Sequence, residues 1–352
     1  MYTWVARDKA SEWQVIESLV ENGQLPCALL IEAVCEPLIA SRNRPAKTPG
    51  QMIRALALRL AAVAAGGDVW IDFGNIATRY SDADVAEMIR TLRESMGPAA
   101  HDVTPLVRTS AGPAERAAVL EWTLDGTSGM AIRVDGVTAL AEKSVMVDAL
   151  ARQPGLDSDN IDLITDSQDL PSLASLRDLA TAFPLSQSCR KWVTLAGSFP
   201  SSVTHLSPDD YDHVIERREW TQYVNAIETT DVPRLPSFGD FATQSARYTV
   251  SPAFRASPTV RYTLADRFLV LRGRLNMPEA SQQYVGHARY LQNLAEFAEI
   301  VRTPADEYIA KIATGRHRTG NGTTWRVASL SRHVHVAAVQ VAAFEGVHAP
   351  VR

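Results

Sequence analysis

Charged side chains recur at the ends of short apolar runs in this chain, where they could take part in chemistry. Glu32 lies in LLIEAV and Asp72 in VWIDFG, and an ionised group in such surroundings is costly unless it is paired or solvated at a site. Carboxylates placed this way can serve as general acids or bases, or bind a divalent cation such as Mg²⁺. Arginines recognise carboxylate and phosphate in a planar, bidentate manner. The polar residues at or near the ends of such runs are Arg7, Lys9, Glu32, Asp72, Arg108, Arg133, Asp135, Asp166, Ser198 and Asp240.

The segment 235–274 carries the densest set of these residues. Its first run, 237–242, contains Asp240 and is typical of a short strand. The β-rich runs 259–263 and 267–272 are separated by three residues, which predicts a hairpin, and the segment ends in Arg272-Gly273-Arg274. An acid at a strand end facing two arginines around a glycine is more than a core requires. We therefore interpret this segment as the last strand of a barrel followed by a lid over the barrel mouth.

Three further patterns could form sites. The loop 315–326 is basic and glycine-rich, and its amides with Arg316, Arg318 and Arg326 could cradle a phosphate, although it lacks the GK[ST] ending of a P-loop and a flexible surface turn is the alternative. Asp162 and Asp166 would share one face of a strand, and Asp166 lies nearer its end. His333 and His335 form an HxH pair, but in a predicted helix their rings point apart, which disfavours a metal site.

The elements that must position these residues alternate between strand and helix along the chain. Eight such strands favour a closed (β/α)8 barrel over an open doubly wound sheet, since no GxGxxG follows any strand. In a barrel the carboxyl ends of the strands meet at one mouth, so the strand-end residues would converge. The predicted strands are 2–8, 28–34, 69–73, 103–108, 130–135, 161–166, 192–196 and 237–242. The predicted helices are 12–22, 50–65, 82–96, 113–125, 139–152 and 173–183, with helical material at 208–211 and 219–226 and an eighth barrel helix at 282–297.

The sequence predicts one domain over residues 1–352. Within it, the hairpin 259–274 is an insertion after the eighth strand, and residues 303–352 form a helical extension with helices at 303–313 and 329–344. The 46% hydrophobic and 21% charged residues are typical of a globular protein. A net charge of -5 and few aromatic residues disfavour a nucleic-acid groove. Three isolated cysteines and the lack of a long apolar run predict a cytoplasmic protein without a membrane partner.

Several local patterns together resemble the beta protein family, which is named after a protein of T-even bacteriophages and is common in bacteria. The patterns are Ile31-Glu32, Trp70-Ile71-Asp72, the span 162–166, LAGSFP at 195–200, Glu219-Trp220, FGDF at 238–241, VRYT at 260–263, LRGR at 271–274 and GNGTTWR at 320–326. The first strand departs from the family's Pro-rich, Lys-Trp opening, which leaves the role of Lys9 open. The resemblance implies a bacterial or phage protein with a part in phage–host conflict. It agrees with Asp240, Arg272 and Trp325 as special positions, and it implies no particular reaction.

Three functions remain open on the sequence. The first is a hydrolase for a small phosphate- or nucleotide-like anion, acting by carboxylate acid/base chemistry or with Mg²⁺ on a phosphoester or glycoside. The second is a non-catalytic binding or sensor protein in anti-phage defence, which predicts strand-end acids salt-bridged to strand-end arginines without an open pocket. The third is a subunit that works beside an effector through an exposed apolar patch. For the hydrolase, the predicted catalytic residues are Asp240, Asp166, Asp72 and Glu32, and the predicted ligand-binding residues are Arg272, Arg274, Arg326, Trp325, Tyr262, Ser198, Arg108 and Arg133.

Overall fold

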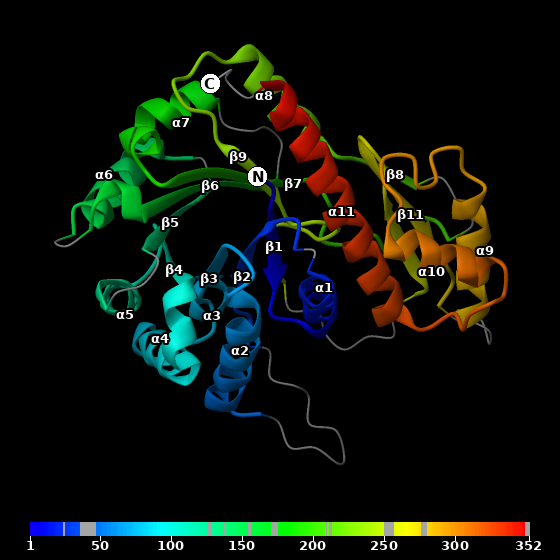
Figure 1. Ribbon diagram of the computed structural model, residues 1–352, viewed down its shortest axis with the longest axis horizontal. Helices are drawn as coiled ribbons and strands as arrows, with labels where there is room; N and C mark the ends of the chain where they lie inside the picture. The colour runs from blue at the N-terminus through cyan, green and yellow to red at the C-terminus, as the bar shows by residue number, and fades with distance from the viewer. Residues whose placement is uncertain are drawn as a thin grey trace.

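Eight parallel strands close into a barrel in the computed structural model (Figure 1). The structure describes residues 1–23, 25–35, 47–125, 129–136, 138–153, 156–169, 175–208, 210, 213–249, 257–275 and 280–348. The barrel strands are β1 (Thr3–Arg7), β2 (Ala28–Glu32), β3 (Val69–Asp72), β4 (Val103–Arg108), β5 (Met130–Asp135), β6 (Ile161–Asp169), β7 (Lys191–Gly197) and β9 (Ser237–Asp240). β9 pairs with both β7 and β1, with Trp4 opposite Asp240, and this closes the ring. The predicted (β/α)8 fold is confirmed.

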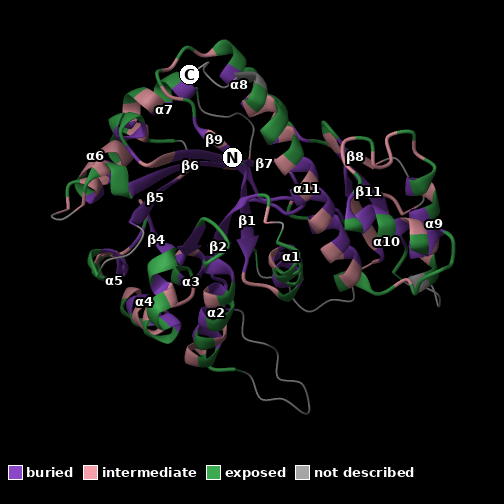
Figure 2. Cartoon of the chain, viewed as in Figure 1, coloured by how far each residue is buried: buried purple, intermediate pink, exposed green. Residues whose placement is uncertain are grey.

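Helices connect successive strands and cover the outside of the barrel. They are α1 (Ala10–Glu21), α2 (Pro49–Ala64), α3 (Gly74–Ala77), α4 (Asp82–Met96), α5 (Pro113–Leu124), α6 (Leu140–Ala151), α7 (Leu176–Ala182) and α8 (Arg218–Thr229). Thr48 and Ser81 begin α2 and α4 with capping boxes, which satisfy amides of the first turn. Figure 2 shows the strands buried and the outer faces of these helices exposed.

The barrel interior has an apolar floor and a charged mouth. Leu30, Trp70, Leu106, Ala131 and Ile164 belong to one buried cluster inside the ring. Alternate residues of a strand share a face, so the interior position two residues further along each of these strands is charged. Those positions hold Glu32, Asp72, Arg108, Arg133 and Asp166, and Arg7 follows Val5 in the same way on β1.

A second, three-stranded antiparallel sheet lies beside the barrel (Figure 1). It consists of β10 (Thr259–Thr263), β11 (Arg267–Arg272) and β8 (His213–Glu216), in the order β10–β11–β8. The predicted hairpin is present, whereas β8 was not predicted. The helical material expected at 208–211 lies partly outside the described residues, since 209 and 211 are not among them.

Two helices cover the small sheet rather than the barrel. They are α9 (Ala280–Gln292) and α10 (Pro304–Ala313), and their apolar residues share one cluster with β10 and β11. Leu291 and Ile312 are fully buried in it. The prediction that residues 282–297 form the eighth barrel helix is therefore wrong.

The long helix α11 (Gly322–His348) takes the place of the eighth barrel helix. Its residues Leu330, Val334 and Val341 lie in the main core, and Trp325 near its start lies in the core of the small sheet. It contacts α1, and Phe344 packs on Trp220 of α8. Although α11 has 27 residues, no helix in the described part of the chain is long and apolar enough to cross a membrane.

Candidate functional site

Arg133 lies at the centre of the charged mouth and contacts three carboxylates. Its Nη1 donates to Glu32 Oε1 at 2.9 Å and also to Asp72. Its Nε and Nη2 donate to Asp166 Oδ2 at 3.1 and 2.6 Å. The four residues come from β2, β3, β5 and β6, and all are buried. The convergence of strand-end charges predicted from the barrel is therefore present for this group.

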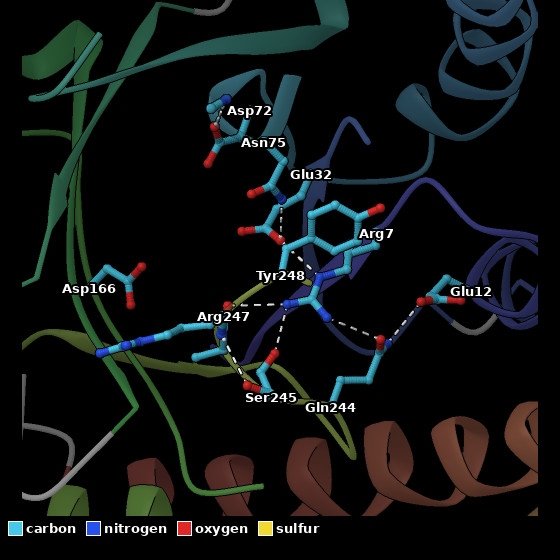
Figure 3. Close-up of polar contacts among 12 residues, drawn as sticks. Arg7, Glu12, Glu32, Asp72, Asn75, Asp166, Gln244, Ser245, Arg247 and Tyr248 are labelled. Carbon is cyan, nitrogen blue, oxygen red and sulfur yellow. Dashed lines mark hydrogen bonds and ion pairs between the residues drawn. The ribbon is translucent and has the colours of Figure 1, made fainter. Parts of the chain in front are cut away.

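Two more arginines complete the mouth network. Arg108 donates from Nε to both oxygens of Asp72 at 2.9 and 3.1 Å, and from Nη2 to Glu32 at 3.4 Å. Arg7 donates to Glu32 Oε2 at 3.2 Å, and Asn75 donates to the same oxygen at 3.0 Å (Figure 3). Three guanidinium groups thus face three carboxylates in one contiguous set of ion pairs.

Neighbouring arginines keep Asp72 and Glu32 ionised. Burial would raise the pKa of Asp72, but Arg108 and Arg133 outweigh it and hold that pKa at about 2. Burial opposes ionisation of Glu32 as well, and Arg133, Arg7 and Arg108 together lower its pKa below the usual value. Carboxylates held this way are ion-pair partners at neutral pH rather than proton donors. Among the described residues, no three His, Cys, Asp or Glu side chains converge to hold a metal ion, so Mg²⁺ stays a prediction.

The segment that follows β9, residues 241–248, folds back into the mouth. Arg7 Nη2 donates to the carbonyl oxygens of Ser245 at 2.7 Å and Ala246 at 3.1 Å (Figure 3). Phe241 and Ala246 join the apolar cluster inside the barrel, and the Arg133 guanidinium lies 5.9 Å from the centre of the Phe241 ring. A Cβ at Gly197 would lie 3.1 Å from Phe241, so a glycine at this position leaves space for residues 241–248. We call residues 241–248 the plug. The mouth is thus covered by this segment, whereas the hairpin predicted as a lid belongs to the small sheet.

The side chain of Asp240 lies on the outer face of the barrel strand β9 and does not reach the mouth. Its neighbour Phe241 points inward, so Asp240 faces the layer between β9 and α11. There it accepts hydrogen bonds from Tyr2 Oη at 2.7 Å, His333 Nε2 at 2.8 Å and the amide of Ala242 at 2.9 Å. Burial lowers the pKa of His333, which leaves a neutral ring that donates to Asp240. Ala242 has φ of 52°, so the Asp240 carboxylate also supports a left-handed turn into the plug.

The arginines of the hairpin lie away from the mouth network. Arg272 donates to the carbonyl of Leu206, in the loop after β7. Arg274 exchanges backbone hydrogen bonds with the side-chain amide of Gln283, at 2.7 and 3.0 Å. The structure therefore does not bring this pair to the carboxylates with which it was predicted to act.

Two predicted aromatic ligands of the site are core residues of the small sheet. Tyr262 donates to Asp306 at 2.8 Å. Trp325 donates to the carbonyl of Thr319 at 2.7 Å and stacks on Tyr284 with ring centres 4.9 Å apart. Both are buried, and neither lines a described cavity.

Asn321, in the glycine-rich loop, caps the start of α11. Asn321 Oδ1 accepts hydrogen bonds from the amides of Thr323 at 2.9 Å and Thr324 at 3.2 Å. These two amides, which belong to the loop predicted to cradle a phosphate, are thus engaged in a helix cap. Of this loop, Arg326 approaches the plug, where it donates to Gln244 at 2.8 Å.

An open cavity of about 250 Å³ lies at the carboxyl ends of β3 and β4, beside the ion-paired network. Arg108 forms one wall, and its side chain is 16% exposed. Asp82 lies behind the start of α5, where it accepts hydrogen bonds from the amides of Ala114 and Glu115 at 2.8 and 2.9 Å. The lining residues are Gly74, Ala77, Asp82, Arg108, Ser110, Ala111, Gly112 and Glu115.

Glu115 is the unusual acid of this cavity, and sequence reasoning missed it. It is 1% exposed, and its Oε1 has no hydrogen-bond partner among the described residues. Burial, with a smaller contribution from Asp72, raises the pKa of Glu115 to about 7. In the sequence it is an ordinary acid in the first turn of a helix, where acids are favoured anyway. Only the packing of α5 beside the cavity shows that Glu115 is buried and lines it.

The closed parallel barrel, with charged residues meeting at the carboxyl ends of its strands, defines a (β/α)8 protein. The chain belongs to the beta protein family, because the sequence model described as Beta protein matches residues 2–338. A search of curated proteins found no match. Among solved structures, the crystal structure of a GH18 chitinase from Pseudoalteromonas aurantia is 12% identical and has a TM-score of 0.31, with 54% of this chain and 76% of that chain covered. A likeness at that score carries no argument, and the fold rests on the strand pairing.

Proposed function

We propose that this protein binds a small anionic ligand in the cavity beside Arg108, with the barrel as a rigid scaffold. The proposal rests on the hydrogen bonds of Arg108 and on its place in the cavity wall. Its Nε and Nη2 are held by Asp72 and Glu32, while its Nη1 makes no hydrogen bond within the described residues and the side chain lines the cavity. An arginine fixed in this way is pre-organised for a carboxylate or phosphate.

Binding is favoured over catalysis at the centre of the mouth. Glu32, Asp72 and Asp166 are paired with arginines, as the binding or sensor alternative predicted, although the open cavity beside Arg108 departs from its prediction of no open pocket. The plug covers the same region. A part for such a sensor in phage–host conflict is proposed from the family resemblance alone.

Glu115 gives the proposed site a defined pH dependence. Below its pKa of about 7, the neutral carboxyl can donate a hydrogen bond to an anion. Above that pH it becomes a carboxylate and repels the anion. Affinity should therefore fall as pH rises from 6 to 8.

The test is isothermal titration of inorganic phosphate, a sugar phosphate and a nucleoside monophosphate at pH 6 and pH 8. We expect Arg108→Lys to weaken binding about tenfold, since lysine keeps the charge but loses the planar donor set. Glu115→Gln should lose the contribution of Glu115 to the pH dependence and keep only the contribution of the second ionisation of the phosphate ligand, whose pKa is about 6. Arg272→Ala, which lies away from the cavity, is the matched control and should bind like the wild type. Loss of binding in the control with no effect of Arg108→Lys would refute the site.

Hydrolysis of the bound ligand is a second candidate, favoured by one observation. A carboxyl with a pKa of about 7 suits a general acid or base at neutral pH, and Glu115 lines the same cavity as Arg108. In this case Glu115→Gln should abolish turnover of a phosphomonoester while it preserves binding. Turnover that persists in Glu115→Gln would leave binding as the function.

A further inference from the structure

A second cavity, of about 580 Å³, lies at the carboxyl end of β7 and against β8. It shares no lining residue with the Arg108 cavity. Ser198, the first residue after β7, opens into it, and Pro200, Val214 and Ile215 give it an apolar side. Glu216 and Arg218 complete the lining. A reactive group at this place would therefore face both apolar and polar surface.

Ser198 is in contact with a buried acid. Its Oγ hydrogen-bonds to Glu219 Oε2, and the same Oγ donates to the carbonyl oxygen of Glu216 at 2.9 Å. A hydroxyl has one proton, so both contacts are satisfied together only when Glu219 is protonated and donates to Ser198. When Glu219 is ionised, Ser198 donates its proton to the carboxylate instead. The pair can thus pass one proton between its two members.

Arg217 holds Glu219 in position. The Nε of Arg217 lies 3.5 Å from Glu219 Oε1, and both side chains are almost fully buried. Arg217 is in turn fixed by the carbonyl oxygens of Leu264 and Ala265, at 3.1 and 3.0 Å. Burial is the main reason that the pKa of Glu219 is raised to about 7, and Arg217 limits the rise. The Oε1 atom has no hydrogen bond within the described residues, which is costly for a buried carboxylate and keeps Glu219 basic.

The geometry points to Ser198 as a nucleophile and Glu219 as its base, in a site that hydrolyses esters with a small apolar acyl group. The arrangement has the parts of an activated nucleophile, namely a hydroxyl, a base within hydrogen-bond reach and a third group that orients the base. Val214 and Ile215 offer the apolar surface for the acyl chain. Arg218, which donates to Glu216 Oε2 at 3.0 Å, adds a positive charge to the lining of the cavity.

The reaction balances with an ester and water alone. Ser198 Oγ bonds to the acyl carbon while its proton passes to Glu219 Oε2. The bond from the acyl carbon to the alcohol oxygen then breaks, and the alcohol leaves with that proton. In the second half, water attacks the acyl-serine, Glu219 takes a proton from the water, and Ser198 regains its proton as the acid is released.

A fluorophosphonate probe tests the nucleophile, since it forms a phosphorus–oxygen bond with an activated serine and releases fluoride. Peptide mass spectrometry of the folded protein should place the label on Ser198. The labelling rate should rise with pH through about 7, as Glu219 becomes ionised. Hydrolysis of p-nitrophenyl butyrate should follow the same pH profile and should be lost in Ser198→Ala.

Glu219→Gln separates chemistry from structure, because it keeps the shape and removes the base. We expect labelling to slow at least about 100-fold and to lose its dependence on pH. The exposed Ser202, four residues away, supplies the control variant Ser202→Ala, which should label at the wild-type rate. Circular dichroism confirms that each variant is folded. Absence of label on Ser198 in the wild type at pH 8, or equal rates in Glu219→Gln and the wild type, overturns the proposal.

Discussion

The guanidinium of Arg133 contacts the carboxylates of Glu32, Asp72 and Asp166, and all four side chains are buried. Removing one charge from such a group is more damaging than removing an exposed one, because its partners stay buried and lose their compensation. Each charged residue of the mouth therefore contributes to stability mainly by compensating the charges of its buried partners.

Asp72→Asn tests this balance. We expect it to lower the free energy of unfolding by about 3–5 kcal/mol, because Arg108 and Arg133 lose a buried counterion. The folded-state pKa of Asp72, about 2, lies below the unfolded value, so its contribution is present above about pH 4 and is lost as pH falls toward 2. Urea unfolding at pH 7 and pH 3 should show a larger loss on acidification in the wild type than in the variant. Asp148→Asn, in an exposed pair with Arg152, is the control and should cost under about 1 kcal/mol.

Glu115 should behave in the opposite sense. Its folded-state pKa of about 7 exceeds the unfolded value, so its relative contribution to stability is present below about pH 4.5 and is lost as pH rises to 7. Glu115→Gln removes this loss and should gain roughly 3 kcal/mol over the wild type between pH 5 and pH 8. Thermal unfolding at the two pH values measures it. An equal pH dependence in both proteins would show that Glu115 ionises normally.

At the scale of elements, α11 is fastened to β9 through His333 and Asp240. Asp240→Asn weakens this contact and the hydrogen bond from Tyr2, and we expect a loss of about 1–3 kcal/mol. Because Asp240 faces away from the mouth, phosphate affinity at the Arg108 cavity should stay unchanged. Urea unfolding and titration calorimetry on the same variant measure both quantities. A large loss of affinity without loss of stability would return Asp240 to the binding site.

The alternation of strand and helix was sufficient to predict the barrel, because each strand is an apolar run with its own helix after it. Glu32, Asp72, Arg108, Arg133 and Asp166 could be placed together because each ends such a run. The side chain of Asp240 could not be placed from the sequence. Phe238 in β9 and Phe241 directly after it are both apolar, and they point to opposite sides of the barrel wall. The sequence therefore does not tell whether Asp240 points into the barrel or away from it.

Other features depend on packing between distant segments. β8 is a four-residue strand with two exposed positions, so it has no clear apolar pattern. Residues 282–297 and α11 both contain enough apolar residues to cover a barrel, and only the contacts show that α11 does so. The raised pKa values of Glu115 and Glu219 come from burial by neighbours far along the chain, which local sequence does not encode.

At the scale of the molecule, α11 joins two cores, because its Leu330 belongs to the core of the barrel and its Trp325 to the core of the small sheet. Ile312 of the neighbouring α10 lies in the same small-sheet core. If the chain is one domain, as we propose, both cores should unfold together. Leu330→Ala and Ile312→Ala should each cost about 2–5 kcal/mol and shift one shared transition, seen alike by far- and near-ultraviolet circular dichroism. Two separate transitions, each sensitive to one variant, would instead indicate two domains.

The position of α11 also matters while the chain is being made. On a ribosome, β9 emerges before β10 and β11 of the small sheet, and α11 emerges after them. Until then, the outer face of β9 lacks its covering helix, and the Asp240 carboxylate lacks the imidazole to which it binds in the finished protein. The rings of Trp220 and Tyr223 lack their contact with Phe344 of α11 for the same interval. A nascent chain of this protein should therefore bind chaperones most strongly between the emergence of β9 and that of α11.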